Sequence, residues 1–396
     1  MITEIFPSML NGTLSAVSSK SYAHRIIVAS MLSDKETKIK INGFSEDIIA
    51  TLECIKSIGG DFTINGNTVT ITPVKDVKEG TYVYCNESGT TARIMVPICA
   101  ALCKCSTVDG GGRLPQRPFS EIVRELRNNG AEIDSDSVPM KIEGKIKSGI
   151  YEIEGNISSQ YITGLLLALP LTESDSEIIL KTPLESAAYV DMTIDVLEKF
   201  GIQIRKTDRG YIVPSSKYIS PGEIIAEGDW SNSAFWVVAD KLGSKIDIQD
   251  INSNSRQGDR KICDVLDDTS IDVSEIPDLF PILSVLAAGR KGETLLHNAR
   301  RLRLKESDRI ESTNALLQSL GCKTEVGEDY LRVFGTGTLE GGIVDGYNDH
   351  RIVMSAAIAS VICKNKVVIK GAEAVNKSYP DFFKEFERLG GKVNVI

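Results

Sequence analysis

The chain has 396 residues, of which 42% are hydrophobic and 25% are charged, and its formal net charge is −9 at pH 7. This length is typical of two to three domains, and the composition excludes a collagen, a disordered tail and a disulfide-stapled miniprotein. The acidic balance argues against a broad nucleic-acid-binding face, so an anionic ligand would need a local cluster of cations.

Metal-ligand spacing is missing from the sequence. The eight cysteines form no C-x-x-C pair, and only three histidines are present. We therefore expect core thiols in a reducing cytoplasm and no metal site. The sequence has neither 18 consecutive uncharged apolar residues nor a secretory leader, so we expect a cytoplasmic protein without a membrane span.

Six segments rich in apolar and small residues recur along the chain, each with polar residues at its start. Because they have hardly any polar face, they predict buried helices. The segments are residues 19–32, 88–102, 158–171, 229–242, 277–288 and 349–362. Ser158, Thr90 and Asp229 have the residue types expected of helix N-caps.

A second unit follows each apolar segment: an amphipathic helix that ends in glycine and runs into a short strand. The five clear copies are residues 51–64, 122–134, 193–205, 315–326 and 382–395, and a sixth at 261–273 has Ser270 in place of the glycine. Each turn lies 39 to 43 residues after the second residue of its apolar segment. Such regular spacing predicts a sixfold α/β repeat, with alternating segments between the helices forming mostly antiparallel sheet.

Six repeats divide most simply into two lobes of three. The most linker-like stretch, residues 214–223, lies between the third and fourth repeats. The repeat count therefore predicts a two-lobed α/β protein with a cleft between the lobes.

Basic residues occupy the first turns of several predicted buried helices, as at Lys20, Arg25, Arg93 and Arg351. Cations there oppose the helix dipole, which favours a shared anion as the reason for their presence. Further cations lie in a glycine-rich loop, in a basic segment and before the last helix: Arg113, Arg117, Lys305, Arg309 and Lys377. Each alone could form a surface salt bridge, but their recurrence at equivalent repeat positions favours ligand binding.

Three carboxylates lie close to these cations in the sequence. Asp278 follows Pro277, Glu306 lies between Lys305 and Arg309 in what reads as one helical turn, and Asp349 precedes a histidine. An N-cap role for the aspartates and a plain ion pair for the glutamate are the alternatives to a role in catalysis.

Ten segments, in this order, resemble signatures of the enolpyruvyl transferase family: SKSYAHR, SGTTAR, RLPQRP, SSQY, EGDWSNSAF, QGD, IPD, LKESDRI, YNDHR and NKSYPDFF. The similarity covers nearly the whole chain. It implies an α+β fold, a two-lobed inside-out α/β barrel of six β/α repeats, three per lobe, with buried parallel helices. The implied lobes are residues 18–226 and residues 1–17 with 227–396, with the active site in the cleft between them.

The resemblance also implies a reaction. A monomer without a cofactor would transfer the enolpyruvyl group of phosphoenolpyruvate to the 5-hydroxyl of shikimate 3-phosphate by addition and elimination, in the shikimate pathway to chorismate and the aromatic amino acids. Asp278 would be the base at the 5-hydroxyl, and Glu306 would exchange the proton at C3, with Lys20 as an alternative proton donor. Asp47, Asp229 and Asp349 would orient cations.

Binding residues carry over by matching position. Phosphoenolpyruvate would contact Lys20, Gly89, Arg93, Arg117, Gln160, Arg309, Arg351 and Lys377. Shikimate 3-phosphate would contact Lys20, Ser21, Arg25, Ser158, Ser159, Gln160, Ser186, Tyr189, Asp278, Arg301 and Lys305. Five residues depart from the commoner family pattern, which blurs the details of substrate contact near Arg301 and of inhibitor response near Gly89: Ser18, Glu87, Arg301, Gly111 and Gly112.

Three alternatives remain. A sister transferase acting on UDP-N-acetylglucosamine normally has a loop cysteine and an asparagine after the first lysine, whereas here Ser21 follows Lys20 and GGGRLPQRP has no cysteine. A non-catalytic anion-binding relative would lack the acid, the base or a cation, and all are present. An RNA-end-processing enzyme with the same repeats fits poorly with the acidic charge.

Overall fold

The computed structural model describes residues 1–396. The chain folds into two compact units, which we call the middle unit (Lys20–Ala226) and the terminal unit (Met1–Ser19 with Glu227–Ile396). Ser18 forms an antiparallel bridge with Gly228, and the Ser19 amide donates to the Glu227 carbonyl. The structure therefore places Ser18 and Ser19 in the terminal unit, whereas the expected lobe boundary assigned both residues to the other unit.

The middle unit contains three four-stranded sheets. Their strand orders are β14(Glu223–Ile225)-β3(Thr37–Lys40)-β5(Thr68–Thr72)-β4(Asp61–Asn65), β6(Thr81–Tyr84)-β7(Cys105–Asp109)-β9(Met140–Glu143)-β8(Glu132–Ile133) and β10(Ile150–Ile153)-β11(Ser176–Leu180)-β13(Gly210–Val213)-β12(Arg205–Thr207). In each sheet the first two strands are parallel and the rest are antiparallel.

Three buried helices fill the core of the middle unit, and three more alternate with them along the chain. The buried helices are α1(Lys20–Met31), α3(Gly89–Leu102) and α5(Ser159–Ala168), in which almost every residue is buried. The others are α2(Glu46–Ile58), α4(Ser120–Asn128) and α6(Ala187–Lys199), each with some exposed residues. The expected division into buried and amphipathic helices is therefore confirmed in this unit.

The terminal unit has two four-stranded sheets and one two-stranded sheet. Their orders are β16(Ser270–Asp272)-β17(Lys291–His297)-β19(Leu331–Thr336)-β18(Lys323–Val326), β20(Gly342–Asp345)-β21(Val367–Lys370)-β1(Ile2–Phe6)-β22(Lys392–Val395) and β15(Lys245–Gln249)-β2(Asn11–Ser15). The helices are α7(Trp230–Lys241), α8(Ile262–Val265), α9(Phe280–Ala288), α10(Arg309–Ser319), α11(His350–Ala359) and α12(Phe382–Arg388). Seven short 3₁₀ turns complete the chain: η1(Leu114–Gln116), η2(Leu169–Leu171), η3(Gly258–Lys261), η4(Pro277–Leu279), η5(Arg300–Leu304), η6(Ser360–Ile362) and η7(Ala372–Lys377).

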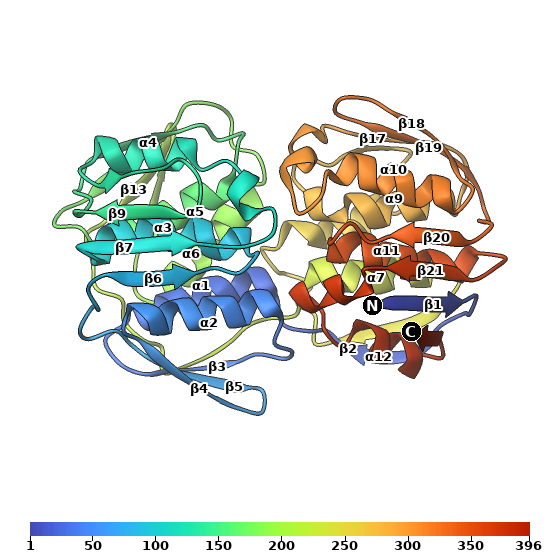
Figure 1. Ribbon diagram of the computed structural model, residues 1–396, viewed down its shortest axis with the longest axis horizontal. Helices are drawn as coiled ribbons and strands as arrows, with labels where there is room; N and C mark the ends of the chain where they lie inside the picture. The colour runs from blue at the N-terminus through green and yellow to red at the C-terminus, as the bar shows by residue number, and fades with distance from the viewer. The chain divides into compact units, whose positions relative to one another are not determined.

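Strands next to the two connections between the units pair with strands that are distant in the sequence. Strand β2, which precedes α1, pairs in parallel with β15, which follows α7. Strand β14, which precedes α7, pairs in parallel with β3, which follows α1. At the other end of the chain, β1 lies between β21 and β22 and is the blue strand beside the red β21 in Figure 1. Residues far apart in the sequence thus complete three of the sheets.

The glycine turns behave as predicted. Gly59, Gly130, Gly201, Gly321 and Gly390 all have positive φ, between 82° and 125°, which allows each helix to end and the chain to reverse. The sixth copy differs, because helix α8 is only four residues long and β16 begins at Ser270. Two adjacent aspartates before Ser270 favour a turn over further helix.

Each unit has its own hydrophobic core. In the terminal unit, Trp236 of α7 stacks on Phe382 of α12 at 5.0 Å between ring centroids. All eight cysteines are free thiols, but Cys263 is exposed and Cys105 half-buried, so the expectation that all are core residues is wrong for these two. The mixed α/β architecture expected from the sequence is confirmed. None of the helices has the length and apolar character needed to cross a lipid bilayer.

Candidate active site

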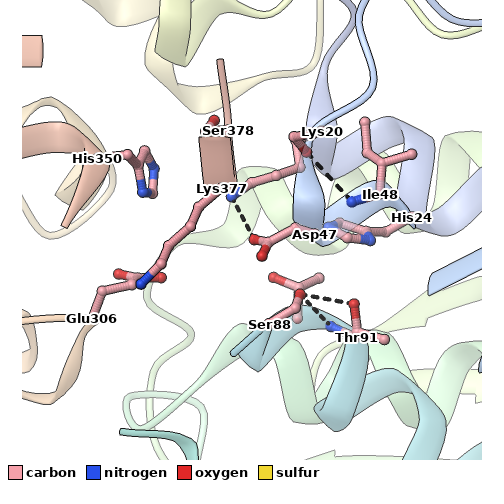
Figure 2. A network of polar contacts seen from close by, with 12 residues as sticks. Lys20, His24, Asp47, Ile48, Ser88, Thr91, Glu306, His350, Lys377 and Ser378 are labelled. Carbon is pink, nitrogen blue, oxygen red and sulfur yellow. Dashed lines mark hydrogen bonds and ion pairs between the residues drawn. The ribbon is translucent and has the colours of Figure 1, made fainter. Parts of the chain in front are cut away.

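Lys20 is the first residue of α1, and its charge is matched by Asp47 of α2. The Lys20 Nζ lies 2.8 Å from Asp47 Oδ2, and both side chains are less than one-sixth exposed (Figure 2). Ser45 begins α2 as its N-cap and accepts a hydrogen bond from the Ile48 amide at 3.4 Å. The pair therefore fixes the ammonium group at the start of a buried helix, where Asp47 orients it.

Gly89 is the first residue of α3, and the guanidinium of Arg117 packs against it. A Cβ at position 89 would lie 2.5 Å from Arg117 Cζ, so any side chain there would displace the arginine. The N-cap of this helix is Ser88, which accepts a hydrogen bond from the Thr91 amide at 3.3 Å. The expectation that Thr90 caps the helix is thus wrong, since helix α3 starts at Gly89, two residues earlier than a Thr90 cap would require.

Gln160 and Arg93 hold each other in place. Arg93 Nη1 donates to Gln160 Oε1 at 2.7 Å, and Gln160 Nε2 donates to Thr90 Oγ1 at 2.8 Å. The Arg93 guanidinium also lies 5.4 Å from the Phe119 ring centroid and 5.5 Å from that of Tyr161. These contacts favour one orientation of the buried cation and of the glutamine amide.

Arg25 brings together residues expected to hold shikimate 3-phosphate. Its guanidinium donates to the Ser21 carbonyl at 2.6 Å, the Tyr189 carbonyl at 2.9 Å and the hydroxyls of Thr163 and Thr193. Burial lowers the pKa of Arg25 to about 10. Ser158 caps α5 through the Gln160 amide, with the buried Ser159 beside it, and Ser186 has left-handed backbone at the start of α6.

In the terminal unit, Arg309 contacts three carboxylates at once. Its Nη1 lies 2.7 Å from Asp278 Oδ1, its Nη2 lies 2.7 Å from Glu306 Oε2, and its Nε lies 2.9 Å from Asp349 Oδ2. The side chain is only 1% exposed. Burial by itself would lower the pKa of Arg309, but the charges of Asp349, Glu306 and Asp278 raise it well above its usual value.

Asp278 in turn contacts three cations. Besides Arg309, its carboxylate lies 2.8 Å from Arg351 Nη2 and 3.6 Å from Lys305 Nζ. Burial alone would raise the pKa of Asp278, but the Arg351, Lys305 and Arg309 charges outweigh it and hold that pKa well below its usual value. Asp278 belongs to the turn η4 and caps no helix, so the N-cap alternative for this residue is wrong.

The segment around Glu306 differs from the predicted single helical turn. Helix α10 begins at Arg309 with Asp308 as its N-cap, and Lys305 ends the preceding turn η5. Lys305 and Arg309 are brought together by Asp278 instead of by helical spacing. Asp349 does cap α11, through the Arg351 amide at 2.9 Å, and Asp229 caps α7 through the Asn232 amide at 2.8 Å. Lys377 donates to the Asn348 carbonyl at 2.8 Å, and Arg301 to the Ser274 carbonyl.

These cation groups stand in a chain that matches one family along almost its whole length. The model of the family described as EPSP synthase (3-phosphoshikimate 1-carboxyvinyltransferase) matches residues 6–275 and 266–386. The chain belongs to the EPSP synthase family.

Named relatives and solved structures of this family agree with the match. Proteins named 3-phosphoshikimate 1-carboxyvinyltransferase from Clostridium novyi and Clostridium perfringens are 38% and 39% identical to this chain, covering 98% or more of both partners. An EPSP synthase structure from Acinetobacter baumannii superposes with a TM-score of 0.83 at 24% identity over the full length of both chains. The enolpyruvyl transferase NikO from Streptomyces tendae gives 0.79 at 14% identity, covering 99% of this chain and 98% of that one. These two structures show the fold.

Two buried ionisable residues of this EPSP synthase family member were not predicted from the sequence. Asp259, within the quoted QGD segment, accepts a hydrogen bond from Ser231 Oγ and is buried. Burial, followed by the charge of Asp278, raises the pKa of Asp259 to about 7 despite the opposing charge of Arg351. His24 of α1 is also fully buried, and burial, aided by Lys20 and Arg25, lowers its pKa well below the usual value. The quoted QGD segment contains Asp259, but only the fold shows its burial.

Proposed function

We propose that the protein transfers the enolpyruvyl group of phosphoenolpyruvate to the 5-hydroxyl of shikimate 3-phosphate, giving 5-enolpyruvylshikimate 3-phosphate and phosphate. The observation that carries the proposal is the interlocked set around Asp278, in which three cations meet three carboxylates in a chain of the EPSP synthase family. The set supplies a base, a second proton-exchanging group and anion-binding cations within a few ångströms of one another.

The charges of the substrates explain the number of cations. Each substrate bears a phosphate and a carboxylate, so their approach is opposed by repulsion that fixed positive charges must offset. In this proposal, phosphoenolpyruvate contacts Lys20, Gly89, Arg93, Arg117, Gln160, Arg309, Arg351 and Lys377. Shikimate 3-phosphate contacts Lys20, Ser21, Arg25, Ser158, Ser159, Gln160, Ser186, Tyr189, Asp278, Arg301 and Lys305.

The reaction then proceeds in two stages. A proton added at C3 of phosphoenolpyruvate makes C2 electrophilic, and the 5-hydroxyl oxygen bonds to C2 as its own proton passes to Asp278. The tetrahedral intermediate loses a proton from C3 and phosphate from C2, which restores the double bond. Glu306 exchanges the C3 proton, and Lys20 is the alternative donor. Each well-placed acid or base contributes about 10²–10⁴-fold to the rate.

Substrate binding also makes Asp278 a better base. Without substrate, three cations stabilise its carboxylate, so it holds a proton weakly. Anions bound to Arg351, Lys305 and Arg309 offset those positive charges and raise the proton affinity of Asp278. The base therefore becomes effective when the site is loaded.

Transfer to UDP-N-acetylglucosamine is the second candidate. Ser21 after Lys20 and the absence of cysteine from residues 110–118 speak against it. We also propose a cytoplasmic monomer, because free thiols are typical of a reducing compartment and one chain supplies every proposed contact.

The test is phosphate release from phosphoenolpyruvate with shikimate 3-phosphate, unphosphorylated shikimate or UDP-N-acetylglucosamine as acceptor. We expect stoichiometric phosphate and enolpyruvyl product with shikimate 3-phosphate alone. Turnover with the nucleotide sugar and none with shikimate 3-phosphate would contradict the proposal.

A further inference from the structure

A chain of buried hydroxyls connects three helices of the middle unit. His24 Nδ1 of α1 lies 2.7 Å from Thr51 Oγ1 of α2, and Thr51 Oγ1 lies 2.8 Å from Thr91 Oγ1 of α3. Thr91 Oγ1 donates to Ser88 Oγ at 2.7 Å (Figure 2). All four side chains are at most 1% exposed. We call this chain the His24–Ser88 relay.

The hydrogen bonds of the relay run in one direction. Because Thr91 gives its only hydroxyl hydrogen to Ser88, it accepts from Thr51, and Thr51 in turn accepts from His24 Nδ1–H. The Thr51 hydroxyl could instead donate to the Asp47 carbonyl, but that contact is 3.3 Å long, whereas the contact with Thr91 is 2.8 Å. The shorter contact favours Thr91 as the acceptor. In the opposite direction, the buried His24 Nε2 would carry a hydrogen without an acceptor, which is costly.

The relay ends at the first turn of α3. Ser88 Oγ accepts two hydrogen bonds, from the amide and the hydroxyl of Thr91, so its own hydrogen is left to point elsewhere. Gly89 and Thr90 are the first two residues of α3, so their backbone amides have no acceptor within the helix. The Arg117 guanidinium lies over Gly89. One hydroxyl, two amides and one cation are therefore gathered at the same helix start.

The relay also sets the position of Lys20 relative to this helix start. Lys20 and His24 lie one helical turn apart on α1, and their partners Asp47 and Thr51 lie one turn apart on α2. These two contacts fix the register of α1 against α2, and the bond from Thr51 to Thr91 continues it to α3. Each contact lies inside the middle unit.

From this geometry we infer that Ser88 donates a hydrogen bond to an anionic oxygen of phosphoenolpyruvate, and that His24, Thr51 and Thr91 are positioning residues that orient its hydroxyl. The inference rests on the proposed function, because it uses the substrate assigned there. Ser88 would thereby be a binding residue beside Gly89 and Arg117.

Steady-state kinetics of Ser88→Gly test the inference, because glycine is tolerated at an N-cap and the substitution removes chiefly the hydroxyl. We expect the KM for phosphoenolpyruvate to rise about tenfold or more, the loss typical of a hydrogen bond to a charged group. The KM for shikimate 3-phosphate should stay within about twofold of wild type. Thr51→Val should raise the KM for phosphoenolpyruvate about threefold, and Thr51→Ser should restore it.

Ser220→Gly is the control, since Ser220 is a buried serine of the same unit whose hydroxyl accepts from the Gly222 amide and donates to the Glu36 carbonyl, both at 3.0 Å, outside the site. It should lower the melting temperature as much as Ser88→Gly does and leave both KM values unchanged. Unchanged KM for phosphoenolpyruvate in Ser88→Gly, or equal rises for both substrates, would overturn the inference alone. A wild-type protein that releases no phosphate from the two substrates would overturn the proposed function and the inference with it.

Discussion

Arg309 binds Asp278 through Nη1 at 2.7 Å while its Nη2 binds Glu306 at the same distance. One buried guanidinium thus joins the proposed base to the proposed proton-exchanging group. A proton gained by Asp278 leaves more of the Arg309 charge to stabilise ionised Glu306, so uptake at one carboxylate favours release at the other.

Asp278→Asn should abolish turnover while preserving binding. The amide keeps the size of the side chain but cannot accept the 5-hydroxyl proton, so kcat should fall at least about a hundredfold. Isothermal titration should still detect shikimate 3-phosphate and phosphoenolpyruvate. If kcat stayed within a few-fold of wild type, Asp278 would not be the base.

Gly89→Ala should weaken the binding of phosphoenolpyruvate and leave that of shikimate 3-phosphate unchanged. The added Cβ overlaps the Arg117 guanidinium, so the arginine must move away from the helix start. We expect the KM for phosphoenolpyruvate to rise about tenfold, because a charge-assisted contact is lost. The KM for shikimate 3-phosphate is the internal control, and a parallel rise in that value would argue against the assignment.

Asp47→Asn should misorient Lys20. The amide removes the negative charge that lies 2.8 Å from the Lys20 ammonium and attracts it. We therefore expect kcat to fall about tenfold, a loss below the range typical of removing an acid or base itself. Asp195→Asn is the matched control, since Asp195 pairs with Lys199 at 2.6 Å on the surface of the same unit. Equal kinetic effects of the two substitutions would show that the Lys20 pair has no special role.

Asp259→Asn should stabilise the fold in a pH-dependent way. The folded pKa of Asp259 is about 7, against an unfolded value near 3.9, so the folded state binds more protons between these pH values. The contribution of Asp259 to the free energy of unfolding therefore decreases as pH rises from about 4 to about 7, and this decrease is complete above pH 7. Asparagine carries no such penalty.

We expect the variant to gain on the order of 2 kcal/mol relative to wild type at pH 8 and little at pH 4. Urea unfolding at both pH values measures this difference. An equal gain or an equal loss at the two values would mean that Asp259 does not ionise in this range.

Elements that are marked by local, repeated residue patterns could be predicted from the sequence. Glycine turns such as Gly59 and Gly321 mark helix ends through their own backbone preference, and apolar segments mark buried helices, so these elements follow from neighbouring residues alone. The pairing of β2 with β15 and of β14 with β3 joins residues more than 180 positions apart, and local patterns do not encode it.

In the candidate site too, some features follow from local sequence and others depend on tertiary structure. Lys20, Arg93 and Arg351 were recognisable because cations at the starts of apolar helices conflict with local preference. The three carboxylates around Arg309 lie up to 40 residues from it in the sequence, and the burial of Asp259 and His24 arises only from tertiary packing. Sequence spacing also misplaced Lys305 and Glu306 in a helix that begins after them.

The most direct test of enolpyruvyl transfer uses phosphoenolpyruvate labelled with ¹⁸O at the oxygen that bridges C2 and phosphorus. Addition at C2 followed by loss of phosphate breaks the bond between C2 and that oxygen. We therefore predict that, with shikimate 3-phosphate present, mass spectrometry finds the label in the inorganic phosphate and none in the enolpyruvyl product. Label retained on the three-carbon product, with unlabelled phosphate released, would show cleavage at phosphorus and contradict the account.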